Sequence, residues 1–274
     1  MKGITSKYIY IFLLLATGGF FLTSCGGSKS EGESSVAEDI TEIKAEIVRK
    51  FKYPIPSSFE VTDLLQNAEA GFVLGITNDP ANVDNYFDRR SKALNLGIYG
   101  ADLSYVTTYN RQDETMDYLK SSRRLIEELE IASTFNEDFA EKVESNIEDK
   151  DALIDIITES FYDTYNVLNE KGEDKISLLV VAGSWIEGVY ITTQIALSTG
   201  YNEEFVNILA SQKAPLDELV RLMEAHAENE DINAVLPQLR YLQEVYNRVG
   251  DELTTDQIDD IAKNVEETRN EIVG

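Results

Sequence analysis

The chain has 274 residues, of which 43% are hydrophobic and 27% are charged, and its formal net charge is −26 at pH 7. This length and apolar content are enough to bury a sizeable core, as one large domain or two small ones. Contact with phosphate needs clustered lysine and arginine, so the acidity argues against nucleic acid as a partner and against a membrane surface bound by charge alone.

Residues 1–24 predict a signal peptide. A basic start with Lys2 and Lys7 is followed by an apolar run over residues 8–21. The run has about fourteen residues, fewer than the roughly twenty that a membrane-spanning helix needs. A retained transmembrane anchor is therefore the alternative that the pattern disfavours.

The segment closes on Leu22, Thr23, Ser24 and the single cysteine, Cys25. These four residues resemble the lipobox of bacterial lipoproteins, in which the residue matching Cys25 receives lipid on its sulfur and becomes the new N-terminus. The resemblance implies removal of residues 1–24 and anchoring in a membrane through fatty acids, palmitate among them. With Cys25 lipidated, no cysteine is left for a disulfide.

Residues 25–35 predict the lipidated cysteine and a flexible tether, because glycine, serine and glutamate dominate them. This acidic stretch loosely resembles the export signals of surface-displayed lipoproteins, although a plain spacer has the same composition. No aspartate follows Cys25 directly, so the inner-membrane retention signal of enteric bacteria is missing. We expect a location in the outer membrane, facing the periplasm or the cell surface.

Residues 36–274 predict a single all-helical domain, an antiparallel bundle or helical array of about nine to eleven helices. Apolar stripes at three- and four-residue steps predict helices, including one over residues 58–76 and one with Met116 on its buried side. Short breaks separate them, among them Gly172 and Gly200. Pro237 is expected within about the first turn of its helix and Thr255 at the start of the last.

Two expected helices, residues 93–108 and 178–193, are apolar nearly all round and contain glycine. An offset of about 85 positions superimposes Asp102 on Glu187, which an internal duplication or a chance match would explain. Residues 176–198 are long enough to span a membrane. Central helices of a core explain the pattern better, with Gly97, Gly100, Gly183 and Gly188 allowing close approach of neighbours.

The residue types and motifs in the sequence exclude most familiar kinds of catalytic site. With one histidine, His226, there is no two-histidine metal site, and no cysteine nucleophile survives lipidation. No nucleophile elbow, phosphate-binding loop or dinucleotide fingerprint is present. We therefore expect no metal, no cofactor and no catalytic residue of a familiar type.

Asp102 and Glu187 are single acids within apolar helices, so each needs a partner, a water-filled cavity or a raised pKa. Neighbouring aromatic and amide groups predict a ligand pocket formed by Asn95, Tyr99, Asp102, Tyr105, Trp185, Glu187 and Tyr190. The alternative is a structural clasp, in which each acid bonds an arginine or a tyrosine of a neighbouring helix.

The sequence favours a lipid-anchored envelope protein that binds a partner protein or a small molecule. A carboxylate-based enzyme using Asp102 and Glu187, and a structural subunit of an envelope complex, are the alternatives. The chain resembles uncharacterised all-helical envelope lipoproteins, mainly over residues 95–105 and 182–190, and this resemblance carries over no functional residue. Acids that converge with aromatic residues in a closed cavity would favour a pocket or an enzyme. Acids that bond separate partners would favour an interaction module.

Overall fold

The computed structural model describes residues 71–131, 137–249 and 252–274. All of these belong to one compact unit, Ile43–Gly274. The predicted signal peptide, the lipidation site Cys25 and the tether lie outside the described residues, and so does the expected helix from residue 58 to residue 70.

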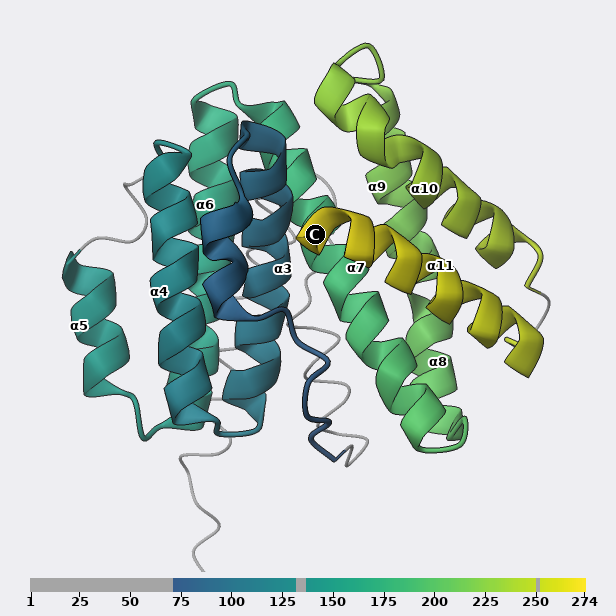
Figure 1. Ribbon diagram of the computed structural model, residues 1–274, viewed down its shortest axis with the longest axis horizontal. Helices are drawn as coiled ribbons and strands as arrows, with labels where there is room; N and C mark the ends of the chain where they lie inside the picture. The colour runs from purple at the N-terminus through teal and green to yellow at the C-terminus, as the bar shows by residue number, and fades with distance from the viewer. Residues whose placement is uncertain (1–70, 132–136, 250–251) are drawn as a thin grey trace, which may run out of the picture. The chain divides into compact units, whose positions relative to one another are not determined.

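The described residues contain nine α-helices and one 3-10 helix and no strand, which confirms the all-α prediction (Figure 1). In chain order they are η1 (Pro80–Asn85), α3 (Arg89–Thr108), α4 (Gln112–Glu128), α5 (Glu137–Ser145), α6 (Lys150–Glu170), α7 (Asp174–Ser198), α8 (Glu203–Ser211), α9 (Lys213–Glu224), α10 (Glu230–Asn247) and α11 (Thr255–Val273).

Helix boundaries follow local chemistry. Asp88 accepts a hydrogen bond from Ser91 N at the start of α3, and Thr254 and Gln257 form a capping box at the start of α11. Gly172 ends α6 in the left-handed region (φ 74°), where glycine has no steric penalty. The cap of α11 is thus one residue before the expected Thr255.

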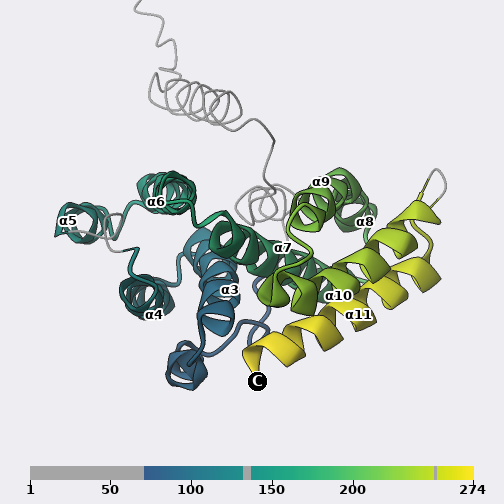
Figure 2. The ribbon, with the colours of Figure 1, turned by 90° about the horizontal axis from the view of Figure 1, so that it is seen from above.

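Helices α3 and α7 lie at the centre, and together they form the most extensive helix contact (Figure 2). Helices α4 and α6 pack against α3, while α8, α9 and α11 pack against α7. Nearly every residue of α7 is buried, from Ile176 to Ala196. By length and composition α7 could cross a membrane, yet its most apolar stretch is fully covered by the rest of the chain, as expected of a core helix.

Three local expectations were wrong. Residues 71–79, which include the end of the expected helix 58–76, are not helical. Pro237 lies inside α10, which begins at Glu230. Because proline has no backbone N–H, α10 lacks the hydrogen bond to the carbonyl of residue 233. Met116 is 41% exposed because Thr115 and Tyr118 occupy the buried side of α4 instead.

Candidate functional site

The central helices cross where two glycines remove the side chains between them. A Cβ atom built on Gly97 would lie 1.9 Å from Val180 O, and one built on Gly183 would lie 2.0 Å from Leu94 O. No side chain fits at either position, so the two backbones touch directly. The glycine-packing prediction is confirmed here, but not at Gly100, where a Cβ would meet only the Phe161 ring at 3.6 Å.

The contact is reciprocal, because an offset of 86 positions superimposes Leu94 on Val180 and Gly97 on Gly183. The two acids, Asp102 and Glu187, differ by 85 positions. The crossing therefore has an approximate two-fold character at its centre. An internal duplication would explain why the two helices contact each other through corresponding residues. The duplication itself stays a prediction.

A non-helical segment, residues 71–79, here called the strap, leads into η1 and is held by buried side chains of α3, α4 and α11. Its backbone has no helical partners, so other groups must satisfy its buried N–H and C=O groups. The bonds, in strap order, are Val73 N to Tyr105 Oη at 2.7 Å, Arg269 Nη2 to Ile76 O at 3.2 Å, Asn78 N to Asp102 Oδ2 at 3.1 Å, Tyr118 Oη to Asn78 O at 2.8 Å, and Tyr99 Oη to Asp79 O at 3.0 Å.

Asp102, Glu187 and Arg269 form the charged centre beneath the strap. Both acids are 0% exposed, and Arg269 is 7% exposed. The Arg269 guanidinium donates two hydrogen bonds to Glu187, from Nε to Oε2 at 2.6 Å and from Nη2 to Oε1 at 3.0 Å. The same guanidinium lies over the Tyr190 ring, 4.4 Å from its centroid. Glu187 thus has the arginine partner that the clasp alternative required.

Asp102 has no cation of its own. Its Oδ2 accepts from Asn78 N, whereas its Oδ1 receives no N–H or O–H from the described residues. The negative charge of Glu187 acts on the Asp102 carboxyl. Two carboxyls and one guanidinium therefore share a site closed to water, and a proton on one carboxyl makes the group neutral.

Burial is the main reason that the pKa of Asp102 lies well above its ordinary value, and the negative charge of Glu187 raises it further. Burial also raises the pKa of Glu187, while the charge and hydrogen bonds of Arg269 act in the opposite direction. Of the two carboxyls, Asp102 therefore holds a proton more readily, because Arg269 hydrogen-bonds Glu187 directly.

Asn95 and Asn78 extend the network to the end of the chain. Asn95 Nδ2 donates to Ser91 O at 2.9 Å and to Ile272 O at 3.0 Å, so it binds the last turn of α11 to α3. The Asn78 side chain donates to Tyr86 Oη at 2.9 Å and lies 3.4 Å from Asn95 Oδ1. A polar network of this kind is stable because nearly every member has a partner.

The structure brings most of the expected pocket residues together around the strap, and none of the four hollows described below is lined by them. Asn95, Tyr99, Asp102, Tyr105 and Glu187 are all 0% exposed, and each bonds the strap, η1 or a neighbouring helix. Trp185 and Tyr190 are also buried. Trp185 does not share the network, since its Nε1 has no hydrogen-bond partner in the described residues.

Sequence reasoning missed several members of the network, among them Asn78, Tyr86, Tyr118 and Arg269. Arg269 lies four residues after Val265, on the buried stripe of α11, and that position was a usable signal of a buried cation. Tyr118 was similarly readable from helical spacing. Asn78 was not, because its role depends on a segment whose backbone is irregular.

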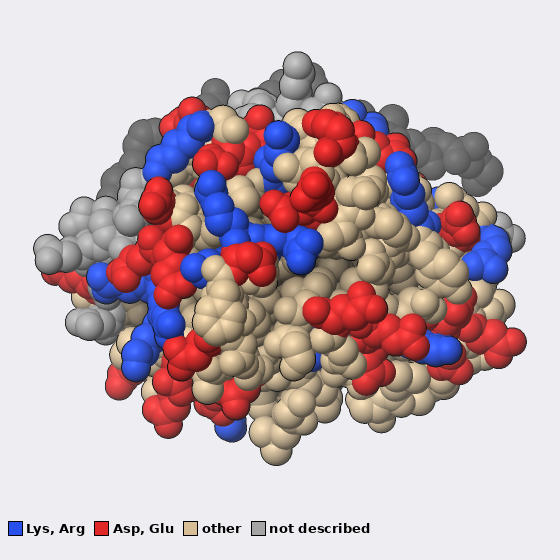
Figure 3. All heavy atoms as spheres, turned by 45° about the horizontal axis from the view of Figure 1, so that its top comes forward, with Lys and Arg blue, Asp and Glu red and all other residues tan. Residues whose placement is uncertain are grey.

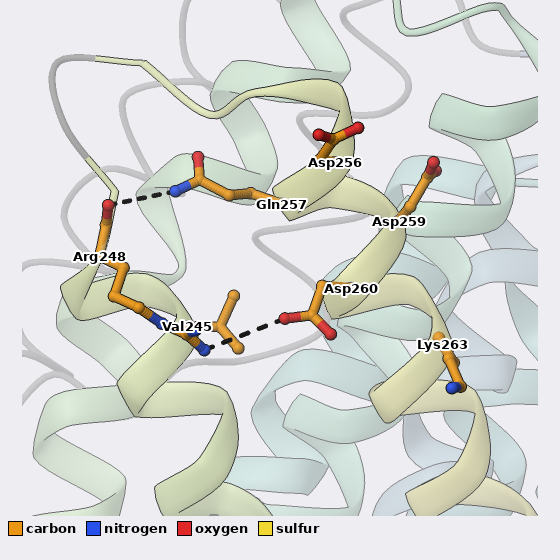
Figure 4. Close-up of a pocket in the computed structure, with 7 residues that line it drawn as sticks. All are labelled: Val245, Arg248, Asp256, Gln257, Asp259, Asp260 and Lys263. Carbon is orange, nitrogen blue, oxygen red and sulfur yellow. Dashed lines mark hydrogen bonds and ion pairs between the residues drawn. The ribbon is translucent and has the colours of Figure 1, made fainter.

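The surface offers hollows, and none of the four described below involves the buried acids. One of about 500 Å³ lies between α10 and α11, with five charged residues among the seven that line it (Figure 4). Its groups pair with each other, as Gln257 Nε2 donates to Arg248 O at 3.1 Å. Others lie between η1 and α4 (about 710 Å³), at the loop before α6 (about 610 Å³), and where α3 meets α10 and α11 (about 190 Å³).

Within the described residues, no group of three or more histidine, cysteine, aspartate or glutamate side chains is placed to hold a metal ion. The chain matches no protein-family model, no curated protein and no solved structure. Any functional conclusion therefore rests on the residues and contacts described above.

Proposed function

We propose that this chain is a lipid-anchored protein of the outer membrane whose helical body binds a partner protein. The observation that carries the proposal is the complete burial of Asp102 and Glu187 within a network that holds the strap. The hydrogen bonds of these acids lie inside the protein, so we place recognition on the outer surface. Small-molecule sites are usually concave and mostly apolar, unlike the charged hollow between α10 and α11.

The surface that best fits a protein partner is the η1–α4 face, defined by the residues that line the hollow between these helices. They are Asp79, Pro80, Ala81, Val83, Asp84, Asp117, Lys120, Ser121, Arg123, Arg124 and Glu127. This hollow is the most voluminous of the four, at about 710 Å³. Alternating charges at its rim suit a partner with a complementary pattern, since such charges set specificity and association rate.

Two exposed apolar side chains lie on or shortly after the elements that form this face. Met116 lies four residues before Lys120, so helical spacing places both on one side of α4. Phe87 follows η1 and is 82% exposed. Aromatic residues and methionine are enriched in protein interfaces. On the side drawn in Figure 3, lysines and arginines lie among aspartates and glutamates, which agrees with a partner of mixed charge rather than a polyanion.

One observation favours the alternative of a carboxylate-based enzyme, because Asp102 and Glu187 lie close enough to affect each other's pKa. Both are fully buried, and the strap backbone occupies Asp102. A substrate would have to displace the strap to reach them. We therefore rank catalysis below partner binding.

Site-specific photo-cross-linking tests the proposal. A photoreactive residue in place of Lys120 should give a discrete adduct with a protein in intact cells, and the same residue in place of exposed Glu244 on α10 should not. Charge reversal by Lys120→Glu together with Arg123→Glu should weaken the adduct. Equal adducts at both positions, or none at Lys120, would contradict the η1–α4 face. An adduct at a fixed one-to-one ratio would indicate a structural subunit of an envelope complex.

Anchoring is tested separately. A Cys25→Ala variant should leave the membrane fraction, because a chain with a formal net charge of −26 is not attracted to an anionic membrane surface. If the variant remains in the membrane with residues 1–24 removed, as shown by its intact mass, α7 must be reconsidered as a span.

A further inference from the structure

The strap is irregular backbone fixed almost entirely by side chains that reach it from other elements. Its own conformation offers little resistance to opening, since Gly75 adopts φ 77° and Leu74 is 75% exposed. Segments with few internal bonds open locally at a free energy below that of global unfolding. What holds this one closed is the set of bonds from α3, α4 and α11, together with the buried Ile76 side chain and the Phe72 ring, which stacks on Tyr105.

The net charge of the cluster beneath the strap depends on a proton. Asp102 Oδ2 holds Asn78 N, and Arg269 holds Ile76 O while it also pairs with Glu187. With one proton between the two carboxyls, the cluster of Asp102, Glu187 and Arg269 is neutral. With none, it carries a net negative charge in a site that excludes water, which is costly.

Of the other titratable groups near Asp102, Arg269 alone supplies a positive charge, and its guanidinium is already paired with Glu187. Those whose ionisation is coupled to it come from α3, α4, α7, α11 and the end of η1: Tyr99, Tyr118, Glu187, Tyr190, Arg269 and Tyr86. The tyrosines are kept neutral by burial, which raises their pKa values. Arg269 is the single cation among these groups.

We infer that the strap is a pH-dependent latch, closed while Asp102 and Glu187 share a proton and released when that proton is lost. Opening exposes Asp102 to water, where its carboxyl ionises with its ordinary pKa. The closed state therefore binds one proton more than the open state over the interval between the ordinary and the raised pKa of Asp102. In that interval the stability of the closed strap falls as pH rises.

The consequence concerns the proposed η1–α4 face and rests on the proposed function. The strap runs directly into η1, and Pro80 O accepts from Ser121 Oγ of α4 at 3.0 Å. Release of the strap loosens η1 on α4. The latch thus regulates the partner surface.

Hydrogen exchange of the Asn78 amide tests the latch on the purified protein without any partner. Its protection factor, corrected for intrinsic exchange, should fall by up to tenfold per pH unit from about pH 5 upward, until it levels at the raised pKa of Asp102. Amides of α9 should keep constant protection. A flat profile for Asn78, or equal slopes for Asn78 and α9, overturns the latch even if cross-linking at Lys120 succeeds.

The variant Asp102→Asn identifies the group. An amide keeps an acceptor for Asn78 N and offers a donor to Glu187, as the protonated acid does, so its Asn78 protection should be independent of pH. Asp117→Asn removes one exposed acid from α4 and should retain the wild-type slope. A wild-type slope in Asp102→Asn refutes the assignment, and the wild-type titration remains decisive should that variant fold poorly.

Discussion

Replacing Gly183 with alanine tests how closely α3 and α7 approach. The new Cβ would lie 2.0 Å from Leu94 O, whereas ordinary van der Waals contact begins at 3.4 Å. The neighbour is a backbone carbonyl within a helix, so it cannot rotate away. The helices must separate by about 1.4 Å, the difference between those two distances.

The cost follows from two opposing effects. Alanine improves helix propensity by about 1 kcal/mol, but overpacking costs about 1 to 3 kcal/mol or more. A gap of only 0.5 to 1 Å already loses about a quarter to a half of the dispersion energy of the atoms that line it. Because α3 and α7 form the most extensive helix contact, we expect Gly183→Ala to lose about 2 to 3 kcal/mol, or roughly 5 to 10 °C in Tm.

Gly100→Ala is the matched control, since its Cβ meets only the Phe161 ring at ordinary contact distance. It should gain up to about 1 kcal/mol from propensity. Gly97→Ala should behave like Gly183→Ala, because its Cβ would lie 1.9 Å from Val180 O. Urea and thermal denaturation give the comparison. Stabilities of all three variants within about 0.5 kcal/mol of one another would refute the close crossing.

Two further substitutions address the buried network. Arg269→Met leaves Glu187 buried without a cation and should lower the free energy of unfolding by about 3 to 5 kcal/mol. Because Glu187 then takes up a proton at low pH, urea denaturation should show this loss of stability growing as pH rises. A loss of stability that does not depend on pH would count against the pairing. Tyr118→Phe leaves Asn78 O without its donor and should cost about 1 to 3 kcal/mol in the same measurement, whereas Tyr241→Phe, at a half-exposed position, should be neutral; equal effects would argue against the bond to the strap.

The presence of most helices could be predicted from the sequence, because an amphipathic stripe depends only on residues close together in the chain. The apolar positions of α11, spaced by three and four residues from Ile258 to Val265, are buried as expected. The breaks at Gly172 and Gly200 were readable for a similar reason, since both residues adopt positive φ at helix ends. Met116 and Pro237 were misplaced because the stripe of α4 and the start of α10 each admit a shift of a few residues.

The candidate site was only partly readable. A carboxyl inside an apolar helix has to be buried, and a buried carboxyl needs a partner, so Asp102 and Glu187 stood out at once. The identity of the partners depends on contacts between residues far apart in the chain, such as Glu187 with Arg269 and Asp102 with Asn78. No periodicity encodes such contacts.

The sequence by itself determined that the described chain is helical, that α3 and α7 are central, and that their acids require compensation. Burial of apolar surface and the cost of an unpaired charge are set by residue type and local spacing, which is why these conclusions needed no coordinates. Only the tertiary structure decided that the strap is not helical, that Asp102 bonds it directly, and that Glu187 pairs with Arg269, which also bonds it. That outcome depends on which distant backbone groups reach the crossing of α3 and α7, because an irregular segment is stable only where other elements satisfy its hydrogen bonds.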